Sequence, residues 1–392
     1  MYMVGLNRVL NPDKTNNLVV GGCNIYKIIY SIVPISYAVL AIFSAIGVYY
    51  WASDFNTWIN CVFLFVISFI LLLKVIRINH TADTIWKCFD ILCDDFLTYC
   101  GRQRSGVLDG YKKKISRVTN LYTIGWVCFV VCWYSNPVFI KQYIAENPKG
   151  QLLVYRNNVL NTLFYPIQVD HYNRFYALFF IAEALIAAWY LVITFAFYSF
   201  TIDFCWTFVA DLRTIASAYE SLGNEDDCTE TLIKKFKAIT YDHQKVMNVI
   251  KQLYDSLKPI IIIEIGSTAY TFIYMTIEYI SFYMEGLSLY SIASLKILST
   301  MVRCIIHLYI LTYHFGLVDH EINALNFSLY SCDWTSKDIK FKKLLLMAMQ
   351  INNANDIKMK VSPKKVVNLE MLGSVLQTSY SVISIIAKNK KQ

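Results

Sequence analysis

Charged residues are scarce in this sequence. Only 16% of its 392 residues are Asp, Glu, Lys or Arg, whereas 56% are hydrophobic and the mean hydropathy is +0.41. Soluble domains carry about 25% charged residues, so the composition excludes an ordinary soluble protein. The hydrophobic residues gather in runs of roughly 20, the length that an α-helix needs to cross about 30 Å of hydrocarbon.

Catalytic and metal-binding patterns are also absent. No GxSxG, P-loop or GxGxxG sequence occurs, and His320-Glu321 is followed by Ala324 where a zinc-binding helix needs its second His. The 11 cysteines include no CxxC pair, the spacing that is typical of metal or redox sites. We therefore expect no enzyme, no metal site and no cofactor.

Seven apolar segments have the length of a membrane span. The sequence predicts an all-α integral membrane protein with seven transmembrane helices, of which the last is the most polar. These predicted spans cover residues 29–51, 58–78, 120–140, 175–200, 259–281, 290–315 and 366–387.

The basic residues predict how the chain is oriented. Most of the 36 Lys and Arg lie in the N-terminal segment and in residues 74–117, 201–258 and 316–365. Because Lys and Arg are retained on the cytoplasmic side, we expect a cytosolic N-terminus and an extracellular C-terminus. The net charge of +8 does not indicate a nucleic-acid partner, since the basic cluster at 112–117 directly precedes a span.

A segment on the predicted cytosolic side has the spacing of a helix that packs against another. Apolar residues recur there at alternating steps of four and three, as in a coiled coil, and such a stripe needs a partner to cover it. A Leu- and Met-rich cluster at 341–349 predicts a second cytosolic helix beside it. His243 lies in the stripe and is expected to be a packing residue, because no second metal ligand lies at helical spacing. The stripe consists of Leu232, Phe236, Ile239, His243, Val246, Ile250, Leu253 and Leu257.

We single out five of the ionisable residues inside the predicted spans, because an unpaired charge there is costly. Glu264 and Arg303 are both expected toward the inner half, and we predict that they pair. Glu183 and Glu278 lie toward the outer half, where they either line a hydrated cavity or sit near the lipid headgroups. Lys296 is the fifth.

Aromatic residues are dense, with 29 Tyr, 24 Phe and 8 Trp. Many are expected in packing and at the membrane interfaces. The outer halves of the second to sixth spans nevertheless carry enough aromatic side chains to wall a pocket for a small apolar molecule. The candidate ligand-binding residues are Phe65, Phe129, Trp133, Tyr176, Phe180, Tyr270 and Tyr274.

The C-terminal part of the chain carries an ordered set of motifs. Tyr330 and Trp334 form a Tyr-x-x-x-Trp step before the Leu- and Met-rich segment, and Ser379-Tyr380-Ser381 is followed by apolar residues. With seven helices and a cytosolic N-terminus, this order resembles the insect odorant receptors. The related gustatory receptors carry Gln-Phe where this chain has Ile386-Ala387, which favours the odorant branch.

The resemblance implies a heterotetrameric, non-selective cation channel that is opened by volatile odorants and built with the odorant receptor co-receptor. It also implies a plasma membrane location in the dendrite of an olfactory neuron, in contact with lipid and permeant cations. By the same resemblance the seventh helix lines the pore, with Ile383 at the apolar gate. Ile386 stands where the co-receptor has a polar Gln, so the chain resembles an odorant-specific tuning subunit. The residues expected to hold the subunits together are Phe236, His243, Ile250, Tyr330, Trp334, Leu345 and Tyr380.

We expect three regions. They are a six-helix bundle with the pocket and cytosolic extensions at 1–315, a cytosolic anchor region at 316–365, and the pore helix with a short tail at 366–392. A gustatory-type channel and a G-protein-coupled receptor remain as alternatives, although the latter needs an extracellular N-terminus and typically carries Asp-Arg-Tyr and Asn-Pro-x-x-Tyr motifs.

Overall fold

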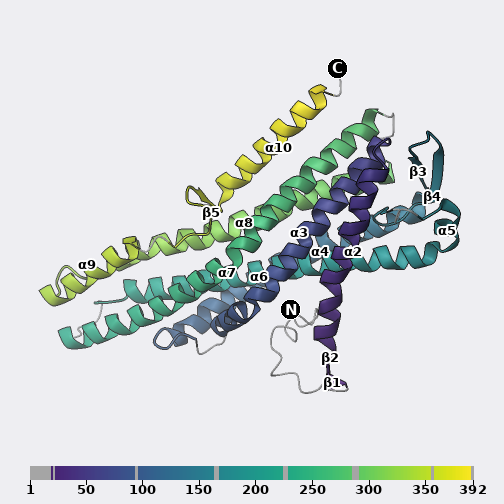
Figure 1. Ribbon diagram of the computed structural model, residues 1–392. Coiled ribbons are helices and arrows are strands. Elements are labelled where there is room, and N and C mark those ends of the chain that lie inside the picture. The colour runs from purple at the N-terminus through teal and green to yellow at the C-terminus, as the bar shows by residue number, and fades with distance from the viewer. Residues whose placement is uncertain are drawn as a thin grey trace.

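The structure is a computed structural model that describes residues 19–20, 23–92, 96–162, 167–223, 228–284, 291–354 and 357–389. Helices dominate these residues (Figure 1). They are α2 (Ile25–Tyr50), α3 (Phe55–Cys88), the 3-10 helix η3 (Phe89–Leu92), α4 (Gly101–Phe139), α5 (Val169–Arg174), α6 (Tyr176–Glu220), α7 (Thr229–Met284), α8 (Ile292–Tyr330), α9 (Ile339–Ala354) and α10 (Leu369–Asn389).

Short antiparallel hairpins connect some of the helices. One of them, together with α5, lies at the opposite end of the molecule from α9 (Figure 1). The hairpins are β1 (Val19–Val20) with β2 (Cys23–Asn24), β3 (Gln142–Glu146) with β4 (Leu152–Arg156), and β5 (Lys360–Ser362) with β6 (Lys365–Val366).

Among the described residues, six helices are long and apolar enough to cross a membrane, namely α2, α3, α4, α6, α7 and α8. They correspond to the first six predicted spans. Most of the seventh predicted span lies in α10, which has 21 residues and contacts α7 and α8 (Figure 1). Among the described helices α10 does not reach the apolar content of the six, in line with its prediction as the most polar span.

Several helices are much longer than a bilayer is thick. The 56 residues of α7 correspond to about 84 Å at ~1.5 Å per residue. Pro259 lies inside α7, which does not end there. The long helices run side by side toward α9 (Figure 1), so a large part of the helical mass lies beyond the membrane-spanning segments.

The largest hydrophobic core is formed by α6, α7, α8 and α9 with η3. Leu232 and Val246 of the predicted stripe are 1% and 0% exposed. Phe236 packs against Tyr219 of α6 and Phe341 of α9, with ring centroids 6.1 Å and 5.7 Å apart. The predicted second helix, α9, thus lies beside the stripe, and α6 and α9 of this chain cover it.

Specific polar contacts fix where the elements begin and meet. Asp54 caps α3 by accepting hydrogen bonds from the backbone N–H groups of Asn56 and Thr57. The same carboxylate accepts from the N–H of Glu146 at 3.0 Å, which ties the β3–β4 hairpin to α3. At the end of α6, Gly223 has a φ of +86° and a Cβ there would lie 2.5 Å from the carbonyl oxygen of Asp333. Only glycine fits this close approach.

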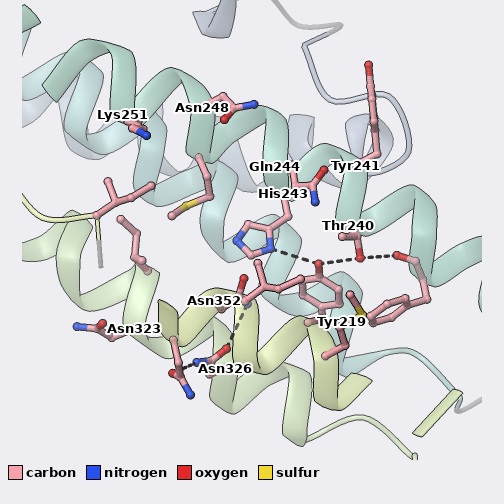
Figure 2. Close-up of a pocket in the computed structure, with 18 of the residues that line it drawn as sticks. Tyr219, Thr240, Tyr241, His243, Gln244, Asn248, Lys251, Asn323, Asn326 and Asn352 are labelled. Atoms are coloured by element: carbon pink, nitrogen blue, oxygen red, sulfur yellow. Dashed lines mark hydrogen bonds between the residues drawn. The ribbon is translucent and has the colours of Figure 1, made fainter. Parts of the chain in front are cut away.

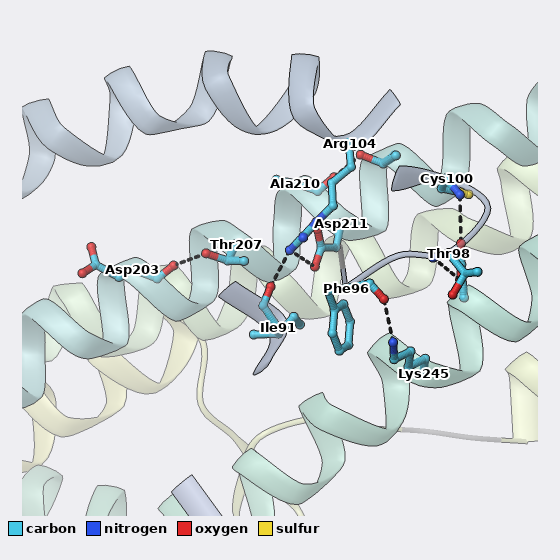
Figure 3. A network of polar contacts seen from close by, with 12 residues as sticks. Ile91, Phe96, Thr98, Cys100, Arg104, Asp203, Thr207, Ala210, Asp211 and Lys245 are labelled. Carbon is cyan, nitrogen blue, oxygen red and sulfur yellow. Dashed lines mark hydrogen bonds and ion pairs between the residues drawn. The ribbon is translucent and has the colours of Figure 1, made fainter. Parts of the chain in front are cut away.

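A buried ion pair joins α4 to α6. Arg104 Nε donates to Asp211 Oδ1 at 2.6 Å, and the two side chains are 1% and 0% exposed. Arg104 also donates to the carbonyl of Ile91, while Lys245 of α7 donates to the carbonyl of Phe96 at 2.7 Å (Figure 3). These contacts hold the segment before α4 against the core.

Candidate functional site

A small cavity lies inside the bundle of α2, α3, α4, α6, α7 and α8. Its volume is about 60 Å³, far below the roughly 300–1,000 Å³ of typical ligand pockets. A ligand can therefore enter only if side chains or helices move apart. We call this space the bundle cavity; most of its lining is apolar and includes Tyr37, Leu40, Phe63, Ile67, Ile186, Leu191 and Met275.

Two of the predicted aromatic residues line the bundle cavity. They are Phe129 and Trp133 on α4, whose ring centroids lie 6.0 Å apart. The indole N–H of Trp133 donates to Thr300 Oγ1 of α8 at 2.9 Å, so the orientation of this ring is fixed by a hydrogen bond.

Tyr270 and Tyr274 on α7 lie behind the wall of the cavity. Both stack on Phe63, with centroid distances of 5.9 Å and 3.9 Å, and Phe63 itself lines the cavity. A change at either tyrosine therefore reaches the cavity through Phe63. Their part in ligand binding stays a prediction.

The remaining predicted aromatic residues are not among those that line the cavity. Phe65 on α3 is 38% exposed on the outside of the bundle. Tyr176 and Phe180 on α6 contact each other, and the Tyr176 hydroxyl donates to the carbonyl of Asn157 at 2.9 Å. These two residues brace the connection that follows β4.

Arg303 of α8 lines the cavity but was not among the predicted binding residues. Its side chain is 8% exposed, and its Nη1 donates to the hydroxyl of Tyr190 on α6 at 2.9 Å. The predicted pair between Arg303 and Glu264 is wrong. Glu264 instead pairs with Lys74 of α3 at 2.5 Å. Lys74 lies where the second predicted span, 58–78, overlaps the basic segment 74–117, and it was counted with the basic segment; α3 continues to Cys88.

Glu183 has a structural partner and does not face the headgroups. Its carboxylate accepts hydrogen bonds from the backbone N–H groups of Leu160, Asn161 and Thr162 at 2.8, 3.0 and 3.1 Å, and from the Thr162 hydroxyl. This holds Leu160, a cavity-lining residue, over the bundle. Glu278 interacts electrostatically with Lys296.

A second, larger space lies between α6, α7, α8 and α9 and shares no lining residue with the bundle cavity (Figure 2). This α7–α9 cleft has a volume of about 910 Å³. His243 lines it, and its Nδ1 lies 3.3 Å from the Tyr219 hydroxyl. Burial lowers the pKa of His243 to about 4. The side chain is therefore neutral at neutral pH, as expected of a packing histidine.

The predicted subunit-contact residues separate into two groups. Phe236, His243, Ile250 and Leu345 are at most 5% exposed and face the core of this chain. Three others lie nearer the surface, where a partner can reach them. Tyr330 and Tyr380 are 57% and 71% exposed, and Trp334 contacts Tyr330 with a ring separation of 5.7 Å.

The predicted gate residue lies on α10. Ile383 is half-buried, and α10 contacts α7 and α8. The side chain of Ile386 lies outside the described residues. Within the described part of the chain, no group of three or more His, Cys, Asp or Glu side chains is arranged to hold a metal ion.

Comparisons with known proteins identify the family of the sequence and solved structures of similar fold. The sequence model of the family "7tm Odorant receptor" matches residues 54–380. The fold is similar to the solved structure of the insect olfactory receptor OR5 from Machilis hrabei, with a TM-score of 0.75 and 12% identity over 98% of this chain and 96% of that chain.

The structure of the same receptor in complex with eugenol gives a TM-score of 0.73 at 12% identity, over 99% of this chain and 97% of that chain. At such low identity the likeness shows the fold alone. Among curated proteins, none matches the sequence. Because the family model covers most of its length, the chain belongs to the odorant receptor family, which comprises multi-pass membrane receptors and not known enzymes.

Proposed function

We propose that this chain is the odorant-binding subunit of an odorant-gated, non-selective cation channel. It assembles with the odorant receptor co-receptor as a heterotetramer in the plasma membrane of olfactory neuron dendrites. Its N-terminus is cytosolic and its C-terminus extracellular. Family membership supports the odorant ligand, and the solved complex of OR5 with eugenol shows that a receptor of similar fold binds a small organic molecule.

The observation that carries the channel proposal is the uncovered face of α10. Gln377, Ser381 and Ser384 follow one another at helical spacing on α10 and are all exposed. Polar side chains are costly in contact with lipid. Beyond the hydrogen bond that the Ser381 hydroxyl donates to the carbonyl of Gln377, these exposed side chains require water or the polar groups of another subunit. An oligomer whose α10 helices surround a pore supplies both.

The bundle cavity is the proposed odorant site. A ligand opens a channel only if it binds the open state more tightly than the closed state. The cavity of about 60 Å³ is smaller than an organic odorant needs, so binding favours a state in which the surrounding helices are spread. Because α7 and α8 line the cavity and also contact α10, spreading them moves the proposed pore helix.

The direct test is whole-cell recording from cells that express the chain with the co-receptor. We expect cation currents that depend on a volatile odorant and that disappear when the odorant-binding chain is omitted. The control is the co-receptor alone at the same surface expression. Lack of any odorant-evoked current across a broad odorant panel, with both proteins at the surface, contradicts the proposal.

An accessibility assay on terminal tags tests the orientation. In intact cells an N-terminal tag is expected to be protected from antibody and a C-terminal tag to be labelled. The opposite pattern contradicts the channel topology and supports the G-protein-coupled alternative.

A further inference from the structure

Of the described residues that line the bundle cavity, Arg303 alone has a charged side chain. Its guanidinium carbon lies 4.8 Å from the centre of the Phe129 ring and 5.4 Å from that of Tyr190. These contacts hold the guanidinium plane between two aromatic side chains. Arg303 is therefore positioned in the cavity wall and does not reach out to lipid headgroups.

The hydrogen-bonding capacity of Arg303 is incompletely used. Nη1 donates to the Tyr190 hydroxyl at 2.9 Å, but the buried Nε has no hydrogen-bond partner among the described residues. An arginine stays protonated in proteins and every N–H is a donor. Leaving a buried, charged donor without an acceptor costs free energy, so an acceptor that enters the cavity is favoured.

The nearby polar groups of the protein do not supply that acceptor. Glu264 pairs with Lys74 at 2.5 Å. Thr300 Oγ1 accepts from Trp133 and donates to the carbonyl of Lys296 at 2.8 Å. The described residues contain no ion pair to Arg303, which leaves a net positive charge beside an otherwise apolar space.

Tyr190 adds a second donor at the same place. Its hydroxyl oxygen accepts from Arg303, so its hydrogen is directed away from the guanidinium. No hydrogen bond donated by this hydroxyl is found among the described residues. An oxygen with two lone pairs suits two donors that meet at one wall.

We propose that the ligand of the bundle cavity is a small apolar molecule with a carbonyl oxygen, which accepts hydrogen bonds from Arg303 Nε and the Tyr190 hydroxyl. The inference rests on the proposed function in taking the bundle cavity as the ligand site. The apolar lining holds the hydrocarbon part, and the two donors select the oxygen. A hydrocarbon of the same size leaves both donors unpaired and binds more weakly.

The test compares 2-pentanone with hexane, which have equal numbers of heavy atoms. Binding to the purified full chain is measured by ligand-dependent thermal stabilisation, which does not require channel activity. For the wild type we expect a Kd for 2-pentanone at least about tenfold below that for hexane. Arg303→Met, which keeps the side-chain bulk, is expected to bring this ratio close to one.

Two further variants make the result interpretable. Arg213→Met removes an arginine that pairs with Glu321 outside the cavity and is expected to keep the wild-type ratio. Tyr190→Phe removes one of the two donors and is expected to give an intermediate ratio, which tests the proposal even if Arg303→Met does not fold. Equal affinities in the wild type, or an unchanged ratio in Arg303→Met or Tyr190→Phe, overturn the proposal.

The proposal on the ligand class and the proposal on channel function can be contradicted independently of each other. Selective binding of 2-pentanone without any odorant-evoked current in cells contradicts the channel and supports the carbonyl site. Currents that hexane evokes as readily as 2-pentanone contradict the carbonyl site and support the channel.

Discussion

At the scale of single residues, His243 gives the chain a defined response to acid. Its pKa is lowered by burial to about 4 from the ordinary value of 6.5. Above pH 6.5 the side chain is neutral in both the folded and the unfolded state, so it adds no pH dependence. Between pH 6.5 and 4 the unfolded chain binds a proton that the folded chain excludes, and the free energy of unfolding falls by up to about 3 kcal/mol.

The variant His243→Gln removes the side chain that binds this proton. Its melting temperature in detergent is therefore expected to fall less between pH 7 and pH 4.5 than that of the wild type, while both proteins keep similar helical content at pH 7. Parallel pH profiles for the two proteins rule out a buried neutral histidine at this position.

A second prediction concerns Trp133, which lines the bundle cavity and is held by Thr300. Trp133→Ala enlarges the cavity, so it is expected to change the order in which odorants activate the channel and to favour larger ones. Ion selectivity is expected to stay unchanged. Concentration–response series for a set of odorants measure this, with Phe65→Ala as control because Phe65 faces the outside. If Trp133→Ala and the wild type respond to the odorants in the same order, Trp133 is not part of the ligand site.

At the scale of elements, the Arg104–Asp211 pair links α4 to α6, and both side chains are buried (Figure 3). Arg104→Met leaves the Asp211 carboxylate buried without its partner, which destabilises a protein by about 3–5 kcal/mol. Lys112→Met is the matched control. Its pair with Asp109 is exposed, and such pairs contribute about 0–1 kcal/mol. Melting temperatures in detergent measure both, and a similar small loss for the two variants contradicts the structural role of the buried pair.

The gate prediction belongs to α10. An apolar ring closes a pore because ions cannot shed their water there without replacement ligands. Ile383→Ala widens and weakens that ring, so the current without odorant is expected to rise. Val382→Ala is the control, since Val382 is 37% exposed and lies on a side of α10 away from both Ile383 and the face of Gln377, Ser381 and Ser384. If the two variants have equal basal currents, the gate is not at Ile383.

The elements also show what the sequence could and could not predict. Long apolar runs and the Tyr-x-x-x-Trp and Ser-Tyr-Ser motifs were sufficient to identify the helices and the family. The partner of Glu264 was not predicted, because Lys74 was counted with the basic segment 74–117, whereas α3 continues to Cys88 and buries this lysine. Pairing between distant segments depends on helix rotation, which a periodic pattern does not specify.

The lining of the bundle cavity was only partly predictable for the same reason. Aromatic content identified two lining residues, Phe129 and Trp133, but Phe65 lies on the far side of α3 and Arg303 was assigned to an ion pair. The full cover of the α7 stripe was not predictable either, because a stripe of apolar residues shows that a partner exists without showing whether it belongs to the same chain.

At the scale of the whole molecule, the bundle cavity and the proposed pore helix, α10, occupy different parts of one chain. The bundle cavity lies among six helices, while α10 stands beside α7 and α8 with its polar face uncovered (Figure 1). Under the proposed function this division separates ligand recognition from conduction. The proposed pore then requires further subunits around α10.

The central claim is that this chain forms part of the channel that its odorant opens. It is tested most directly in excised membrane patches from cells that express the chain and the co-receptor, bathed in solution free of nucleotides. We predict that an odorant opens single cation channels in such patches and that Ile383→Ala in this chain changes their open probability. Loss of the odorant response on excision, or channel openings that do not depend on Ile383, would contradict the account.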